Sequence, residues 1–382
     1  MKQLVGIGLA TAALVAPMHL LAQGVASCPN PIPIALTVPL TSGIALLGVQ
    51  ARNGIEDAID QINSAGGVGG KKLKLSTEDA TASSTTALNS LNRLMGANPV
   101  VVFSSMISPH IFTQAEVIKR DGVPLLFTGT NAQLMHMGIP WFFRMHVHDG
   151  QLADLVPRYI VETMKMKKPA IIAVSDDYGL GASKEMQKTF ESLGVKLVAL
   201  ESYGASDKDM SAQLTNIKKA GADVILVWGR PGDVTLVLKQ RKQLGIDIPV
   251  VGNSSVVSTP ALNNLTAEEA DGALAIGGMI PQVSQDPVVQ GFVKRITDKY
   301  RVPPDNFAVA YRDATYMVKA AIEKVGCDRK AVRDELAKTK DFKGLLITYK
   351  ADSFGDLAHT LGVYRNKGKS PQLVDTIKER GF

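Results

Sequence analysis

The stretch that decides the fold is VVFSSMISPHIFTQAEVIKRDGVPLLFTGTN, residues 101–131. Apolar, partly β-branched runs at residues 100–103 and 123–127 predict two strands. Between them, Ser108 and Pro109 predict a helix start, with Ser108 as the N-cap and Pro109 in the first turn. Asp121 and Gly122 mark the end of this helix. Strand, helix and strand in this order predict a β-α-β unit of a parallel sheet.

Small hydroxyl side chains follow both predicted strands. Ser104, Ser105 and Ser108 come after the first strand, and Thr128 and Thr130 come after the second. The carboxyl ends of parallel strands meet at one sheet edge, where helix N-termini can offer N–H groups to an anion. Each residue singly could be an ordinary cap or turn former. Two such clusters at successive strand ends favour a small-molecule cleft.

Length and composition allow two domains and argue against nucleic-acid binding. The chain has 382 residues, 45% hydrophobic and 20% charged, which is enough for two α/β domains that each have a core. The formal charge is +6, from 42 Lys and Arg against 36 Asp and Glu. The basic residues are scattered and aromatics make up only 5%, whereas a nucleic-acid groove needs a basic stripe with stacking platforms.

The first residues predict export. Lys2 precedes an apolar segment at residues 4–15 that is too short to span a bilayer, and Ala22 and Ala26 are small residues at possible cleavage points. We therefore expect a signal peptide over residues 1–26 and a mature protein in the periplasm.

The two cysteines, Cys28 and Cys327, leave two possibilities open. Residues 25–28 (VASC) resemble a lipobox, which would make Cys28 a lipidated N-terminus. A disulfide between Cys28 and Cys327 is natural in an oxidising compartment. We favour the disulfide, because Pro17 and His19 are unusual inside a lipoprotein signal.

The remainder of the chain alternates short apolar strands with amphipathic helices. Strands are predicted at residues 32–38, 73–77, 170–174, 195–200, 224–228 and 250–252, and helices at 50–63, 85–95, 181–193, 207–220 and 233–244. The first loop, which contains Leu47, runs to Gly48. This alternation predicts doubly wound parallel sheets.

Four motifs in order resemble the branched-chain amino-acid-binding family, the type I periplasmic solute-binding proteins of ABC importers. The first motif comprises Gly54, Ala58, Ile62, Asn63, Ala65, Gly66, Gly67, Val68, Gly70, Lys72 and Leu73. Residues 176–181 (DDYGLG) match the Asp-x-Tyr-Gly turn of that family, and residues 310–314 (AYRDA) match its Gly/Ala-Tyr-x-Ala helix. Gly252 opens the segment after a late strand, as it does in the family.

The resemblance implies two Rossmann-like lobes joined by three hinge crossings. We place these crossings near residue 148, near residues 279–282 and near residues 351–356. Lobe 1 would then comprise residues 27–148 and 282–351, and lobe 2 would comprise residues 149–281 and 352–382.

The resemblance also implies the ligand contacts. Ser108 lies at the position whose hydroxyl meets the ligand carboxylate, and Thr128 and Thr130 lie at positions that give backbone and hydroxyl bonds. Tyr178, from the other lobe, would close over the ligand. Neutral donors of this kind suit a carboxylate held at a strand–helix edge.

Three positions depart from the amino-acid-binding pattern. Ser254 stands where that subfamily has an acid for the ligand ammonium, Arg230 replaces a tyrosine, and Leu47 replaces an aromatic. A buried ammonium without a carboxylate costs several kcal/mol, and a guanidinium favours an anion. We therefore expect a small organic acid, aromatic or dicarboxylic, although a surface salt bridge is an alternative role for Arg230. An amino acid remains the alternative ligand.

Other functional classes find little support. His146 and His148 could present two imidazoles to a metal or a substrate, but no second cluster completes such a site, so we expect a hinge role with His148 as a polar contact near the cleft. Neither a nucleophile elbow nor a phosphate or dinucleotide loop is present in the sequence. We expect a monomeric binding protein without cofactor or metal whose partner is a membrane ABC permease. A ligand-sensing receptor component of the same fold is the alternative.

Overall fold

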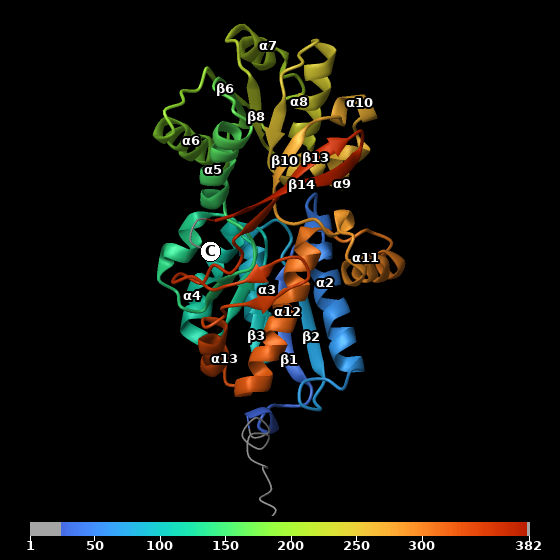
Figure 1. Cartoon of the computed structure of the whole chain (residues 1–382). Helices are drawn as coiled ribbons and strands as arrows, with labels where there is room; N and C mark the ends of the chain where they lie inside the picture. Colours follow the sequence, from blue (N-terminus) through green and yellow to red (C-terminus); the bar gives the residue numbers. More distant parts are fainter. Residues whose placement is uncertain (1–23, 380–382) are drawn as a thin grey trace, which may run out of the picture.

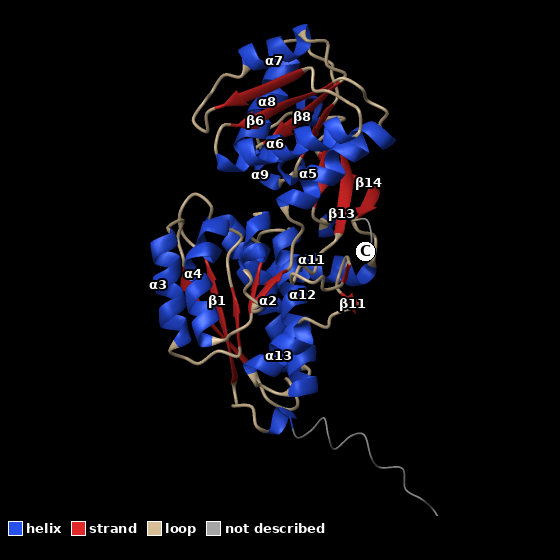
Figure 2. Cartoon of the chain, turned by 90° about the vertical axis from the view of Figure 1, so that its left-hand side faces the viewer, coloured by secondary structure: helices blue, strands red, loops and turns tan. Residues whose placement is uncertain are grey.

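The computed structural model describes residues 24–379 as two lobes, one above the other in Figure 1. Each lobe has a central sheet with helices packed on both faces, as Figure 2 shows with strands in red and helices in blue. The expected signal peptide lies almost wholly outside the described residues. None of the described helices is both long enough and apolar enough to cross a membrane.

The lower lobe contains a five-stranded parallel sheet. Its order is β2-β1-β3-β4-β5, made of Leu73–Asp79, Ile32–Val38, Val101–Phe103, Leu125–Phe127 and Phe142–Arg144. Helices α2 (Ala45–Ser64) and α12 (Asn306–Val325) cover one face, and α3 (Ser84–Met95) and α4 (Ser108–Asp121) cover the other. The opening β-α-β unit is thus β3-α4-β4, at the centre of this sheet.

The upper lobe contains a seven-stranded sheet. Its order is β14-β13-β10-β9-β8-β6-β7, made of Ser370–Lys378, Thr360–Lys367, Leu274–Gly277, Val250–Gly252, Val224–Trp228, Pro169–Val174 and Ala199–Tyr203. Strands β6 and β8 are buried at every residue, because helices cover both faces. These helices are α5 (Asp149–Arg158), α6 (Asp177–Ser192), α7 (Ser211–Lys219), α8 (Pro231–Gln243), α9 (Thr259–Asn263) and α10 (Ala267–Ala270). Strand β13 pairs antiparallel to β10, and β14 pairs antiparallel to β13, which the alternation in the sequence did not predict.

Further helices and short elements complete the two lobes. Helices α11 (Pro287–Tyr300) and α13 (Arg329–Leu336) flank α12, and β11 (Phe342–Lys343) pairs with β12 (Thr348–Tyr349). Short helices lie at Ala132–Met137 in the lower lobe, at Tyr159–Thr163 and Ser254–Val257 in the upper lobe, and at Pro281–Val283 in the second crossing.

The chain passes between the lobes three times, which confirms the expected architecture. The crossings lie between β5 and α5, between β10 and the turn at Pro281–Val283, and between β12 and β13. A buried ion pair joins the first and third crossings, because Arg144 Nε and Nη2 both donate to the Asp356 carboxylate. Arg144 thus stabilises the junction of the lobes.

Several predicted elements begin elsewhere in the structure. Helix α2 begins at Ala45, so Leu47 lies in its first turn and not in a loop. Strand β7 begins at Ala199, because Val195 and Leu197 pack against the core outside the sheet. Helix α7 begins at Ser211, because the Asp207 carboxylate accepts from Gly204 N–H and closes a turn before it.

Cys28 and Cys327 form a disulfide with Cα atoms 5.2 Å apart. It ties the segment before β1 to the residue that follows the end of α12 by two positions. The cross-link closes the chain over a sequence separation of 299 residues.

Candidate functional site

Ser108 lies at the edge of the lower sheet and leaves the start of α4 open. The helix begins at Ser108 with Ile107 in the N-cap position and no side-chain cap, so the expectation that Ser108 is the N-cap was wrong. The Ser108 hydroxyl instead accepts from Asn131 N–H at 3.1 Å, in the loop after β4. Because this oxygen accepts, its own proton remains free for a ligand. An uncapped helix start beside a hydroxyl donor suits an anion.

Thr128 has a structural role in this arrangement. Its side chain is fully buried, with Oγ1 3.2 Å from the hydroxyl of Tyr311 on α12. The Tyr311 hydroxyl donates to the Ser104 carbonyl, so it can only accept from Thr128. The Thr128 hydroxyl therefore ties β4 to α12 and does not offer its proton to a ligand.

Thr130 lies beside an acid that sequence reasoning did not select. Its carbonyl accepts from Asp149 N–H at 2.9 Å, and its side chain forms a hydrogen bond with the Asp149 carboxylate. Burial raises the pKa of Asp149 to about 6, against the opposing effects of Thr130 and of the Arg144 charge. Asp149 is the first residue of α5, directly after the first crossing.

Tyr178 presents its hydroxyl from the upper lobe. The Tyr178 oxygen accepts from Asn253 Nδ2 at 2.8 Å, so its proton is free to donate. Asn253 follows β9, is buried and also donates to the Gly229 carbonyl. The ring of Tyr178 lies 6.1 Å from that of the buried Trp228, centroid to centroid. Burial raises the pKa of Tyr178, and the negative charge of Asp149 raises it further.

Arg230 already has a carboxylate partner in the structure. Its Nη2 lies 2.7 Å from Asp176 Oδ2, and both side chains are about half exposed. Burial opposes ionisation of Asp176, but the Gly179 N–H and the Arg230 guanidinium hold the pKa of Asp176 below its ordinary value. Arg230 also lies over the Tyr178 ring, with 5.7 Å from guanidinium carbon to ring centroid. This is the salt-bridge arrangement that the sequence left open.

Ser254 and Leu47 have other surroundings in the structure. Ser254 begins the single turn after β9, and its hydroxyl fills the space that a side chain on Gly277 would need. Leu47 lies half-buried in the first turn of α2. No described contact joins either of them to Ser108 or Tyr178.

The two histidines of the first crossing have structural hydrogen bonds. His148 is the N-cap of α5, and its Nδ1 accepts from the N–H groups of Gly150 and Gln151. Burial is the main reason that the pKa of His148 falls to about 4. His146 Nε2 lies 2.7 Å from Asn306 Nδ2, and its Nδ1 lies 2.8 Å from the Val147 carbonyl.

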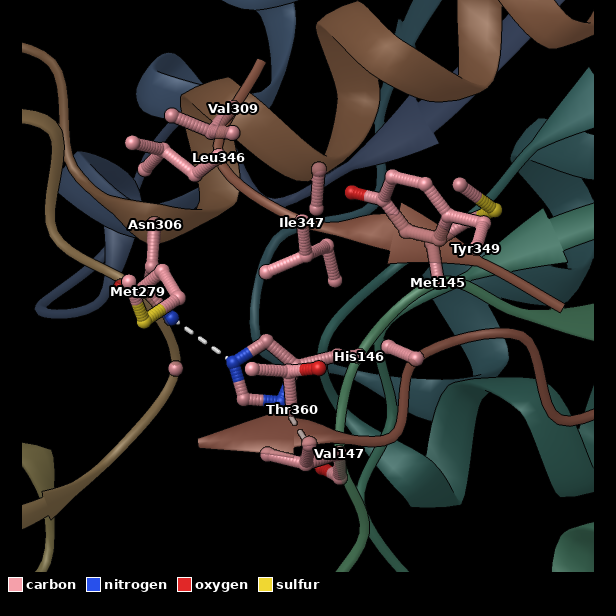
Figure 3. Close-up of a pocket in the computed structure, with 13 residues that line it drawn as sticks. Met145, His146, Val147, Met279, Asn306, Val309, Leu346, Ile347, Tyr349 and Thr360 are labelled. Carbon is pink, nitrogen blue, oxygen red and sulfur yellow. Dashed lines mark hydrogen bonds between the residues drawn. The ribbon is translucent and has the colours of Figure 1, made fainter. Parts of the chain in front are cut away.

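These contacts surround a small cavity where the crossings meet (Figure 3). His146 from the first crossing, Met279 from the second and Thr360 from the third line it, together with Asn306 of α12. Its volume of about 30 Å³ is far below the roughly 300 Å³ of a small-molecule pocket. The cavity therefore belongs to the hinge. Among the side chains that the structure describes, no three His, Cys, Asp or Glu are placed to hold a metal.

Sequence reasoning missed Asp149 and Asn253 for different reasons. Asp149 was missed because its position beside Thr130 depends on how the first crossing folds. Asn253 directly follows a buried strand, as Ser104 does in the lower lobe, and that position was the available signal.

Comparisons with known proteins agree with this architecture. A family model described as periplasmic binding protein matches residues 31–370. The Leu/Ile/Val-binding protein homolog 3 of Brucella melitensis is 27% identical over 330 residues, covering 86% of this chain and 89% of that protein.

Two solved structures share the fold. The branched-chain amino acid transporter substrate binding protein LivJ of Streptococcus pneumoniae, in complex with isoleucine, superposes with a TM-score of 0.82 at 24% identity, covering 92% of this chain and 100% of that one. A solute binding protein of an ABC transporter from R. palustris, in complex with benzoate, gives a TM-score of 0.75 at 18% identity, covering 92% and 99%.

Proposed function

Because the chain belongs to the periplasmic binding protein family, we propose that it is the exported substrate-binding component of an ABC importer and captures a small carboxylate between its lobes. The ligand would bind the edge of the lower sheet first, and the upper lobe would then close over it about the three crossings. Closure is favoured only as far as the ligand binds the closed form better than the open one. The membrane permease would recognise that closed form.

The observation that carries this proposal is the uncapped start of α4 beside Ser108. The Ser108 oxygen accepts from Asn131 N–H and so can donate its proton to a ligand oxygen. Tyr178 offers a second free hydroxyl proton from the opposite lobe. Two neutral donors and a helix N-terminus together suit one carboxylate group.

For the ligand class, we propose a small organic acid, aromatic or dicarboxylic. Ser254 supplies no charge for an ammonium where the amino-acid-binding subfamily has an acid. The aromatic choice is the better supported, because the half-buried ring of Tyr178 lies at the site with the buried Trp228 ring packed beside it. A dicarboxylate would have to compete with Asp176 for Arg230.

A second candidate is an α-amino acid, and Asp149 is the observation that favours it. This acid lies beside Thr130, where an ammonium next to the bound carboxylate could reach it. Proteins of this fold include one solved with isoleucine and one solved with benzoate, so the fold alone does not distinguish an amino acid from an aromatic acid as the ligand.

Calorimetric titration of the wild-type protein and of Ser108→Ala tests the site. We expect wild type to bind at least one of benzoate, succinate and leucine. The alanine variant should bind that ligand about 10- to 100-fold more weakly, because a hydrogen bond to a charged group contributes roughly 1.5–3 kcal/mol. Ser192→Ala, at an exposed position near the end of α6, is the matched control.

Equal affinity of Ser108→Ala and wild type would show that the carboxylate binds elsewhere. Absence of binding to all three acids by wild type would contradict the proposed ligand class. Without ligand, Ser108→Ala and Ser192→Ala should have the same melting temperature as wild type, because Ser108 lies half-exposed at a helix start.

A further inference from the structure

We propose that Asp149 selects the ligand, by accepting a hydrogen bond from a second donor group, hydroxyl or ammonium, that the ligand carries in addition to its carboxylate. This inference rests on the proposed function, because it assumes that the carboxylate binds at Ser108. It assigns to the first crossing a role in specificity beyond joining the lobes.

The backbone places Asp149 next to the carboxylate-binding edge. Its N–H donates to the Thr130 carbonyl at 2.9 Å, while the neighbouring Asn131 N–H donates to Ser108 at 3.1 Å. Asp149 and Ser108 therefore hold adjacent residues of the same short loop after β4. A ligand bound at Ser108 lies within one small molecule's length of the Asp149 side chain.

The Asp149 carboxylate has acceptor positions to spare. Thr130 gives it one hydrogen bond, whereas an ionised carboxylate can accept about four. The guanidinium of Arg144 acts on it only at a distance, since Arg144 is bound to Asp356 through two nitrogens. Over residues 24–379, no Lys, Arg or His forms an ion pair with Asp149. A half-buried acid with one neutral partner is stabilised when another donor binds to it.

Helix packing in the upper lobe brings Tyr178 near Asp149. Helix α5, which begins at Asp149, packs along α6, which begins one residue before Tyr178. The negative charge of Asp149 raises the pKa of Tyr178, which agrees with the packing of these two helices within the upper lobe. A ligand donor between them would therefore meet an acceptor from the first crossing, while the ligand carboxylate meets the free protons of Ser108 and Tyr178.

The expected consequence is selectivity between close analogues. A site built to accept a hydrogen bond rejects an analogue that lacks the donor, because its own polar group is then buried unpaired. Asp149 could thus partner an ammonium despite the serine at position 254. Hydroxylated aromatic acids would satisfy the same acceptor through a neutral donor.

Two matched ligand pairs test the inference by calorimetry. Leucine is compared with 4-methylpentanoate, which lacks only the ammonium, and 4-hydroxybenzoate is compared with benzoate, which lacks only the hydroxyl. We expect wild type to bind the donor-bearing acid of one pair at least tenfold more tightly than its analogue. The pair that shows this preference identifies the ligand's donor group as an ammonium or a hydroxyl. Asp149→Asn should reduce that preference to threefold or less.

Asp154→Asn is the control. Asp154 lies on the same helix, is 44% exposed and pairs only with Arg158 in the described contacts, so this variant should keep the wild-type preference. An unchanged preference in Asp149→Asn, with a normal melting temperature, would overturn the inference. Wild-type binding without preference for a donor would overturn it too, while the proposed function would stand. If wild type bound none of the four acids, both the inference about Asp149 and the proposed function would be contradicted.

Discussion

Replacing Asp356 by alanine should destabilise the protein more than any exposed substitution, because it leaves a buried guanidinium without its counter-ion. The Arg144 side chain is 1% exposed and the Asp356 side chain 6%. Arg144 also donates to the Asn131 carbonyl at 2.8 Å, and so supports the loop that holds Ser108. The same substitution should therefore weaken ligand binding.

The magnitude follows from this burial. Breaking a buried ion pair by removing one partner costs about 3–5 kcal/mol, whereas an exposed pair contributes about 0–1 kcal/mol. The unfolding entropy is about 2.1 cal/mol/K per residue, so a chain of 382 residues shifts its melting temperature by only about 1.2 °C per kcal/mol, and the melting temperature should fall by roughly 4–6 °C. Replacing both residues together, as Arg144→Met with Asp356→Leu, should recover much of the loss, because no buried charge remains.

The assay is scanning calorimetry with guanidinium unfolding, at fixed pH and without ligand. Asp298→Ala is the matched control, since Asp298 pairs with Lys294 on the surface of α11 and both side chains are more than half exposed. We expect that control to change the unfolding free energy by less than about 1 kcal/mol. If Asp356→Ala costs no more than Asp298→Ala, the reasoning from burial is refuted.

Two further predictions concern pH and packing. Burial lowers the folded-state pKa of His148 to about 4, below its ordinary value of 6.5, so the protein should lose stability as pH falls from about 6.5 to about 4. The His148→Asn variant keeps a cap acceptor and should lose less stability over this pH range. Identical profiles of stability against pH for wild type and variant would contradict this. A side chain on Gly54 of α2 would meet the Ala308 carbonyl of α12, so Gly54→Ala should destabilise by roughly 1–3 kcal/mol or more in chemical unfolding. Gly181→Ala in α6 meets no atom within 4 Å and should be neutral or slightly stabilising; equal losses in both variants would argue against the close helix approach.

The sequence by itself determined the class of fold and the lower half of the candidate site. Strand and helix periodicities are local, and Pro109 with its flanking hydroxyl residues marks a helix start that no distant residue needs to specify. The Gly-rich turn and the later motifs then indicated the family.

Only the tertiary structure decided which polar groups remain available for a ligand. Thr128 gives its proton to Tyr311, 183 positions away in sequence, and Arg230 pairs with Asp176 from a different helix start. Asp149 was not expected to contact the ligand, yet folding leaves it with one neutral partner at the first crossing. A hydrogen bond is decided by which atoms meet, and residues far apart in the sequence meet only when the chain has folded.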